Sequence, residues 1–261
     1  MATDELLVER NDHILTLTLN RPERMNAISG PMLSALSEEL QKANTDPDVR
    51  VVIMTGAGRG FCSGLDLKDQ AGGDGPIGRG YRLFDLHNSP PVVINRMDKP
   101  IICALNGPAA GYGMDMALGC DIRIASEHAR LGAVFAKRGV LPESGGCWYL
   151  PRLIGWARAA EVAYLGDVLD ADRCLELGLV NKVVPHDQLM DEAMAWATKI
   201  AKNAPLSVQA TKRMMRLGLD ETFEAAVDHI FLQLLPLFQS EDFKEGIAAF
   251  MEKREPAFKG R

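Results

Sequence analysis

The sequence lacks the features that mark secreted, disulfide-bonded and membrane-spanning proteins. Its five cysteines are widely spaced and include no C-x-x-C pair, which argues against a disulfide framework or a structural zinc site and favours buried free thiols. The first residues include acids where a signal peptide carries basic residues, and no apolar core follows them. No run approaches the roughly 20 apolar residues of a membrane span. We therefore expect a cytoplasmic protein.

An excess of positive charge is also missing. Lys and Arg number 29 against 35 Asp and Glu, so the formal net charge is −6. Such a chain repels nucleic acid and anionic membranes unless a local basic cluster overrides the average, and no lysine-rich helix of that kind is found. We therefore expect neither nucleic acid nor a membrane as a partner. The length of 261 residues fits one large domain, with at most a small appendage.

Motifs of several enzyme classes are absent as well. The glycine-rich segment 56–64 reads G-x-G-x-G and no Gly-Lys-Ser/Thr follows, so it is neither a dinucleotide fingerprint nor a P-loop. Ser63 lies one position too late for the G-x-S-x-G of a serine hydrolase. The five histidines form no H-E-x-x-H or i, i+4 pair, and we assign no metal ligand among them.

Apolar periodicity predicts an α/β core. Strands are expected at residues 6–8 and 14–19 around a turn at Asn11-Asp12, and the second should be half-buried because leucine and threonine alternate along it. A helix capped by Ser29 should then run to Asp46-Pro47. Further strands are expected at residues 51–55, 101–105 and 121–125.

The end of the chain is predicted to be helical, with no strand after Val184. We place a boundary near residues 203–205, which divides a core of residues 1–203 from a tail of residues 204–261 that is too short to be stable alone. Helices are expected at residues 189–202, 207–217, 221–238 and 241–253. The apolar side chains of the tail must pack on the core or on another subunit; they include Met214, Met215, Phe231, Leu234 and Leu235.

Two glycine-flanked turns follow predicted buried strands, at residues 61–66 and 111–115. Small residues let a ligand approach the main chain closely, as an oxyanion hole built from backbone N–H groups requires. The second turn also begins a helix, where free N–H groups and the helix dipole favour negative charge. The glycine pattern taken alone favours a simpler explanation, tight packing of a strand against a helix.

Several short segments, in this order and spacing, carry a family resemblance. They are Leu19-Asn20-Arg21-Pro22 with Asn26-Ala27, Gly60-Phe61-Cys62-Ser63-Gly64-Leu65-Asp66-Leu67-Lys68, Lys99-Pro100 with Asn106-Gly107, Cys120-Asp121, Leu150-Pro151-Arg152-Leu153-Ile154-Gly155, Gly178-Leu179-Val180 and Phe250-Met251-Glu252-Lys253-Arg254. Over nearly its whole length the sequence resembles the crotonase, or enoyl-CoA hydratase/isomerase, superfamily. The resemblance implies an α/β spiral of repeated strand-strand-helix units, with a C-terminal helical region that builds homotrimers, often paired into hexamers.

In such enzymes two backbone N–H groups bind the thioester oxygen of an acyl-CoA substrate. By match these belong to Leu65 and to Tyr112, which replaces the usual glycine and whose side chain could narrow the pocket. No cofactor besides the CoA of the substrate is implied, and no metal. The resemblance also places a set of residues along the CoA path and the substrate pocket, the last two contributed by the tail of this or a neighbouring subunit: Arg24, Ala27, Ser63, Gly64, Asp66, Leu67, Lys68, Gly111, Phe135, Phe250 and Lys253.

The acid-base residues depart from the hydratase pattern. Typical 2-enoyl-CoA hydratases use two glutamates, but here Asp115 occupies the first position and Phe135 the second. Glu143, in the segment Leu141-Pro142-Glu143-Ser144-Gly145-Gly146, instead resembles the carboxylate of 3-enoyl-CoA and ring-1,2-epoxyphenylacetyl-CoA isomerases. One carboxylate suffices to take a proton from C2 and return it at C4. We therefore predict a 3-enoyl-CoA isomerase with Glu143 as its proton shuttle.

Two alternatives stay open. A 2-enoyl-CoA hydratase could position water with Asp115 and Glu143 together, and the loss of the second glutamate at Phe135 would suit a catalytically silent acyl-CoA-binding protein. Asp115 is either a second acid or a helix-start residue that orients nearby backbone. Without the resemblance, Glu143 would be read as an acid favoured by the dipole of the next helix. Trp148 and Tyr149 are expected in the core or in a pocket wall.

Overall fold

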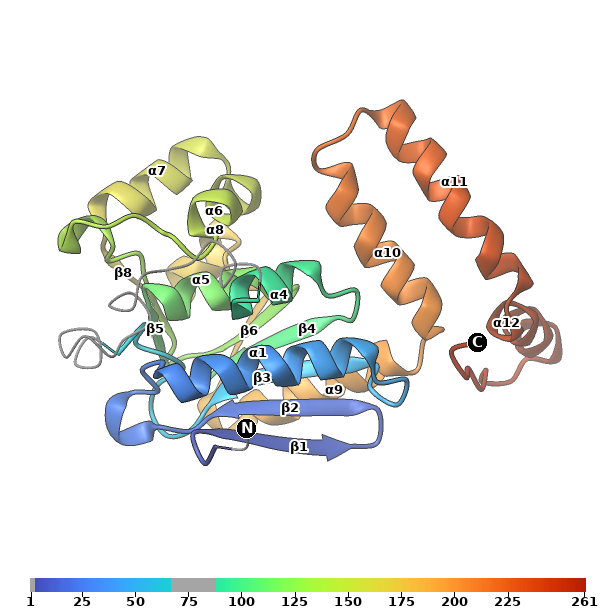
Figure 1. The fold of residues 1–261 in the computed structure, drawn as a ribbon, viewed down its shortest axis with the longest axis horizontal. Helices are drawn as coiled ribbons and strands as arrows, with labels where there is room; N and C mark the ends of the chain where they lie inside the picture. The colour runs from blue at the N-terminus through green and yellow to red at the C-terminus, as the bar shows by residue number, and fades with distance from the viewer. Residues whose placement is uncertain (1–2, 67–87) are drawn as a thin grey trace.

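The computed structural model describes residues 3–66 and 88–261, so the predicted contacts of Leu67 and Lys68 lie outside the described residues. Strands and helices alternate along the core, and helices follow it (Figure 1). The strands are β1 (Leu6–Asn11), β2 (Ile14–Leu19), β3 (Val51–Gly56), β4 (Ile101–Leu105), β5 (Pro108–Ala110), β6 (Ile122–Ser126), β7 (Arg130–Gly132), β8 (Val168–Asp170) and β9 (Lys182–Val184). The helices are α1 (Gly30–Thr45), α4 (Pro90–Arg96), α5 (Tyr112–Gly119), α6 (Gly146–Ile154), α7 (Trp156–Leu165), α8 (Ala171–Leu177), α9 (Leu189–Ala201), α10 (Pro205–Gly218), α11 (Phe223–Gln239) and α12 (Glu241–Glu252).

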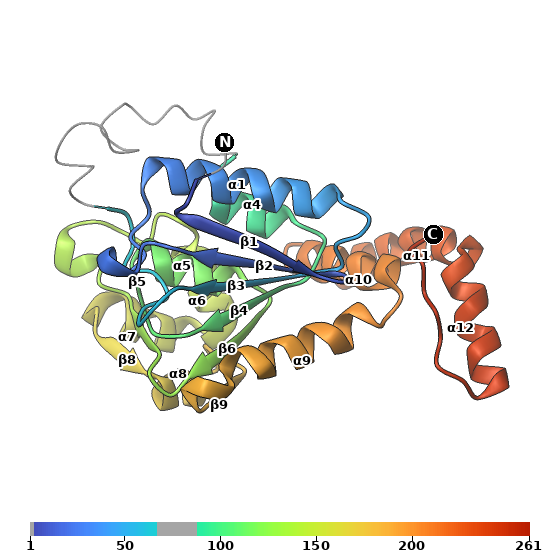
Figure 2. The same cartoon turned by 90° about the horizontal axis from the view of Figure 1, so that it is seen from below.

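One six-stranded sheet organises the core, in the order β1-β2-β3-β4-β6-β9. The opening β1–β2 hairpin is antiparallel, and the remaining pairs run parallel. Helices α1, α4 and α5 lie over one face, and α9 covers the other (Figure 2). Each face buries its own apolar cluster, the larger one beneath α1 and α5 and the smaller one beneath α9. The predicted α/β fold is confirmed.

Local signals placed α1 correctly, whereas the burial expected for β2 is wrong. The Ser29 hydroxyl caps α1 by accepting a hydrogen bond from Met32 N at 3.1 Å, and the helix ends before Asp46. In β2 every residue except Thr18 is buried. The leucines pack towards α1, while Thr16, which alternation places on the opposite face, is covered because α9 lies there. A threonine in an inner strand of a two-sided sheet is therefore no sign of exposure.

A second sheet of three short strands, β5-β7-β8, was not expected from the sequence. Each of its strands has three residues, too few to show a period of two. In this sheet β5 pairs in parallel with β7, and the backbone then passes directly into α5. The small sheet thereby fixes the position of the turn at residues 111–115.

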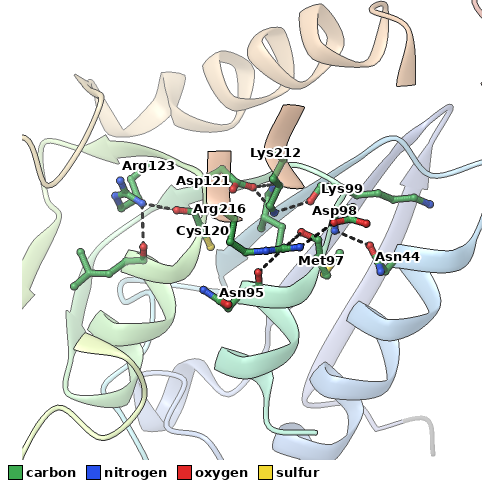
Figure 3. A network of polar contacts seen from close by, with 12 residues as sticks. Asn44, Asn95, Met97, Asp98, Lys99, Cys120, Asp121, Arg123, Lys212 and Arg216 are labelled. Atoms are coloured by element: carbon green, nitrogen blue, oxygen red, sulfur yellow. Dashed lines mark hydrogen bonds and ion pairs between the residues drawn. The ribbon is translucent and has the colours of Figure 1, made fainter. Parts of the chain in front are cut away.

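The helices α10, α11 and α12 extend beyond the body of the molecule (Figures 1 and 2). Polar contacts attach α10 to the core (Figure 3): Lys212 Nζ donates to Lys99 O at 2.9 Å and to Asp121 Oδ2 at 2.7 Å, and Arg216 pairs with Asp98 at 3.1 Å. Burial of Asp98 opposes its ionisation, but Arg213 and Arg216 outweigh burial and lower the pKa of this carboxyl. Charged side chains of α10 therefore contribute several of its contacts with the core, beside the buried Pro205 and Ala210.

Apolar side chains of the tail do not all pack on the core. Met215 is 67% exposed and Phe231 57% exposed within this chain. The sequence left open whether these side chains pack on the core or on another subunit, and this arrangement favours another subunit. The trimer or hexamer stays a prediction. Within residues 3–66 and 88–261, no helix combines the length and the apolar character that crossing a membrane requires.

Candidate active site

The two glycine turns of the sequence lie against each other. An isolated parallel bridge joins Cys62 to Ala109, and Ala110 N donates to Cys62 O at 3.0 Å. Gly113 packs so closely that a Cβ atom there would lie 2.2 Å from Cys62 O. Gly64, with φ of 108°, faces Ala110 O and the backbone N of the next helix. The glycines therefore allow the two turns to pack closely and also leave their main chain uncovered by side chains.

Gly113 offers a direct test of this contact. Gly113→Ala is expected to lower the free energy of unfolding by about 1–3 kcal/mol, because the added methyl group forces the two turns apart. Urea unfolding measures the change. Gly30→Ala is the matched control, since nothing lies within 4 Å of its Cβ position at the start of α1. Equal stability of the Gly113 and Gly30 variants would show that the turns are not in tight contact.

The main chain presents N–H groups from both turns. Ile28 N donates to Gly64 O at 2.8 Å, and Asp66 N donates to Ile28 O at 3.0 Å. In a parallel bridge of this kind the intervening residue, Leu65, directs its own N–H away from Ile28. Tyr112 is the first residue of α5, so its N–H group lies at the N-terminus of that helix. A Cβ on Gly64 would lie 3.7 Å from Tyr112 N, so the two turns bring these N–H groups into one neighbourhood.

Two cavities meet at this point. The larger, about 1140 Å³, lies among α4, α6 and the end of α10, and its wall includes Trp148 and Tyr149 as expected. The smaller, about 510 Å³, is bounded largely by apolar side chains: Val134, Phe135, Val140 and Leu141. Among the described residues that line them, the two cavities share three: Leu65, Tyr112 and Glu143.

Glu143 is exposed to both cavities immediately before α6. The chain turns there through Gly145, whose φ of 109° suits glycine. Phe135 is only 4% exposed and also lines the smaller cavity beside Glu143. The carboxylate therefore stands at the junction of the cavities, next to an apolar wall.

Asp115 lies behind this loop, in α5, and lines neither cavity. It is 0% exposed, and its Oδ2 accepts a hydrogen bond from Ser144 N at 3.1 Å. Its Oδ1 lies beside the Gly146 backbone and has no well-directed hydrogen bond among the described residues. Burial raises the pKa of Asp115 to about 7, the charge of Glu143 adds to the rise, and the N–H groups of Gly146 and Ser144 oppose it. The carboxyl group thus contacts the loop that carries Glu143.

Four of the residues predicted to lie along the substrate line the smaller cavity: Ser63, Gly64, Gly111 and Phe135. Arg24 is exposed at the end of a short 3₁₀ helix (Pro22–Arg24), and its carbonyl accepts from the Ser63 hydroxyl at 3.3 Å. It therefore lies close to the first glycine turn, with its guanidinium on the surface.

Ala27 and Asp66 are less available than the sequence suggested. Arg21 donates to Ala27 O at 2.7 Å and pairs with the buried Asp66 carboxylate at 3.1 Å. The Asp66 side chain is thereby held inside the protein, and its charge is engaged by Arg21 rather than presented to a ligand.

Phe250 and Lys253 are not brought to the site within this chain. They lie at the end of α12, which in both views is far from α5 and α6 (Figures 1 and 2). Phe250 is 83% exposed. A role at the site therefore requires the tail of a neighbouring subunit, which the sequence interpretation allowed.

Asn95 of α4 lines the larger cavity and was missed from the sequence. It is followed by Arg96 in a helix that is otherwise apolar, and no local pattern connects it with Tyr149, whose hydroxyl accepts a hydrogen bond from Asn95 Nδ2 at 3.1 Å. Their proximity depends on how α4 and α6 pack.

The architecture and the paired turns define an enzyme of the crotonase class. A family model described as enoyl-CoA hydratase/isomerase matches residues 9–261, and the chain belongs to this family of acyl-CoA enzymes. It is 40% identical over 255 residues to (E)-benzylidenesuccinyl-CoA hydratase from Thauera aromatica, with 97% of this chain and 98% of the relative covered. It is 37% identical to 1,2-epoxyphenylacetyl-CoA isomerase from Escherichia coli, with 95% of each chain covered. The crystal structure of an enoyl-CoA hydratase from Mycobacterium tuberculosis matches it with a TM-score of 0.90 at 36% identity, over 99% of this chain and 100% of the other.

Proposed function

We propose that the protein moves the double bond of a 3-enoyl-CoA into the 2-position. One observation carries the proposal: Leu65, Tyr112 and Glu143, the residues shared by the two cavities, are a pair of candidate N–H donors and one carboxylate. A thioester placed at this junction has its CoA arm in one cavity and its acyl group in the other. Its carbonyl oxygen and its C2 then lie within the same small region.

The proposed reaction begins with transfer of a proton from C2 to the Glu143 carboxylate. The electron pair of the broken C–H bond moves onto the thioester oxygen, which the N–H groups of Leu65 and Tyr112 stabilise. Losing one such donor typically costs about 2.7–4 kcal/mol of transition-state stabilisation. Glu143 then returns the proton to C4 as the enolate collapses and the 2,3 double bond forms. Protons and electrons balance without a redox cofactor.

The apolar wall beside Glu143 supports isomerisation over hydration. Phe135 stands where the hydratase pattern has a second glutamate. Ser63 and Arg138 also line the smaller cavity, but its wall includes the apolar side chains of Phe135, Val134 and Leu141. These groups offer no hydrogen bond to a water molecule. A dry wall also favours proton return to carbon, because water competes less well for the carboxyl proton.

The competing hydratase mechanism needs a second acid that contacts water. Asp115, the residue proposed for it, is buried behind the Glu143 loop, and its Oδ2 is engaged by Ser144 N. The silent acyl-CoA-binding alternative rests on the loss of a glutamate at Phe135. It leaves unexplained why Glu143 stands at the cavity junction.

Two thioesters separate these functions. The protein is expected to convert 3-hexenoyl-CoA to 2-hexenoyl-CoA and to hydrate crotonyl-CoA much more slowly, as followed by absorbance of the conjugated thioester and by chromatography of the products. Rapid hydration of crotonyl-CoA without a shift of the 3-enoyl double bond would establish the hydratase instead. Binding of both thioesters with turnover of neither would establish the silent protein.

A further inference from the structure

The larger cavity suits the acyl group. Ser63, which the family resemblance places along the CoA path, lines only the smaller cavity, so the CoA arm is taken to pass there, with Phe135 beside the thioester and Glu143. The acyl group then extends from the junction into the larger space of about 1140 Å³. Ligand pockets for drug-sized molecules typically measure about 300–1,000 Å³, so this cavity holds an acyl group much larger than crotonyl.

A hydrogen-bonded pair of polar side chains lies among the apolar residues that line this cavity. Asn95 Nδ2 donates to the Tyr149 hydroxyl at 3.1 Å, and both residues line the cavity beside apolar Pro91, Val92 and Trp148. Because Tyr149 accepts this bond, its own O–H hydrogen can still be donated. Among the described residues nothing bonds to that hydrogen or to Asn95 Oδ1. One donor and one acceptor therefore remain on neighbouring side chains.

The pair is held firmly. Arg216 donates to the Asn95 carbonyl at 2.7 Å, which ties this end of α4 to α10. The Tyr149 ring meets Trp148 edge to face, with 5.1 Å between ring centroids. Gly145 leaves room for the tyrosine ring, since a Cβ atom there would lie 2.8 Å from its Cε2. A site fixed in this way binds a ligand without first losing side-chain freedom.

The length of helix α5 gives the distance between the Asn95–Tyr149 pair and the proposed position of the thioester. Tyr112 N opens the helix, and the Tyr149 hydroxyl lies 3.4 Å from the Cβ position of Gly119 at its other end. Seven steps of about 1.5 Å separate these ends by about 10 Å. An extended chain covers about 3.5 Å in three bonds, so about eight bonds span this length.

We propose that Asn95 and Tyr149 bind a hydroxyl group carried by the acyl chain about eight bonds from its thioester carbonyl. Tyr149 donates to the hydroxyl oxygen, and Asn95 Oδ1 accepts its hydrogen. A carboxylate fits less well, because it has no hydrogen for Asn95 Oδ1 to accept; the charged side chains of the lining, Arg96, Arg216, Asp220 and Glu221, balance in number. The inference rests on the proposed function for the position of the thioester, but not on which reaction follows.

Binding of saturated thioesters tests the site without turnover. The full-length protein is titrated calorimetrically with octanoyl-CoA and with 8-hydroxyoctanoyl-CoA. We expect the hydroxylated thioester to bind about tenfold more tightly, and Tyr149→Phe to abolish this preference. Tyr164→Phe is the matched control, because Tyr164 is 71% exposed on α7. The control variant should keep the preference unchanged.

Each outcome supports or overturns the hydroxyl site, the isomerase reaction or both. Equal affinities of the wild-type protein for the two thioesters would overturn the proposed hydroxyl site, as would a Tyr149→Phe variant that weakens both equally. Asn95→Ala gives a second check and should also remove the preference. If the preference is present but 3-hexenoyl-CoA is not isomerised, the proposed reaction fails while the hydroxyl site stands. If neither thioester binds, both proposals fall.

Discussion

Glu143→Gln is expected to lower the turnover of 3-hexenoyl-CoA by about 10³-fold and to leave the affinity for octanoyl-CoA nearly unchanged. The glutamine keeps the size and shape of the side chain at the cavity junction, but it cannot take a proton from C2. The N–H groups of Leu65 and Tyr112 are untouched, so binding of the thioester oxygen persists. A loss confined to kcat is the signature of an interaction that acts in the chemical step.

The measurement needs kcat from the 3-enoyl assay and a dissociation constant for the saturated thioester. Glu9→Gln, at an exposed position of β1, is the matched control for removal of one negative charge and should behave as wild type. An active Glu143→Gln variant would reduce Glu143 to an acid placed favourably before the N-terminus of α6. The isomerase mechanism would then have no proton carrier.

Features of the fold that depend on residues close together in the sequence could be predicted from it. Ser29 and Asp46-Pro47 bracket α1 because capping and helix termination act over three or four residues. The three strands of the second sheet were invisible because three residues contain no periodic signal. The burial of Thr16 was likewise hidden, since it depends on α9, whose sequence lies far along the chain.

The candidate site also has some features that could be predicted from the sequence and others that could not. The turns around Leu65 and Tyr112 could be found from their glycines and from the family resemblance, and the structure places both turns beside Glu143. The burial of Asp66 could not be found, because its partner Arg21 lies in a different segment and the salt bridge forms only when the two segments meet. Asn95 escaped for a similar reason, since its partner belongs to another helix. Sites formed by residues adjacent in the sequence can be predicted from it, whereas contacts between distant segments are found only in the folded structure.

Asp115 is expected to act on Glu143 through the loop rather than on the substrate. Asp115→Ala removes the acceptor of Ser144 N, and we expect kcat to fall about 10²-fold, since small displacements of a catalytic group have costs of this size. Asp115→Asn retains an oxygen that accepts the same bond, so its loss should stay within about tenfold. A catalytic acid would behave differently: asparagine cannot exchange a proton, and both variants would then be equally impaired. Steady-state kinetics of the two variants, with circular dichroism to check folding, separates the roles.

The stability of the Asp115→Asn variant supplies an independent readout. Burial raises the pKa of Asp115 to about 7 from its ordinary 3.8, so the native state holds this proton more tightly than the unfolded state. Between about pH 4 and pH 7 the free energy of unfolding should therefore fall as pH rises, by at most about 1.4 kcal/mol per pH unit from this group. The asparagine side chain of the variant does not titrate, and urea unfolding at pH 5 and pH 7 should show a smaller decrease for the variant than for the wild type. Identical slopes would mean that Asp115 is ionised throughout this range, and its buried contact with the Glu143 loop would need another explanation.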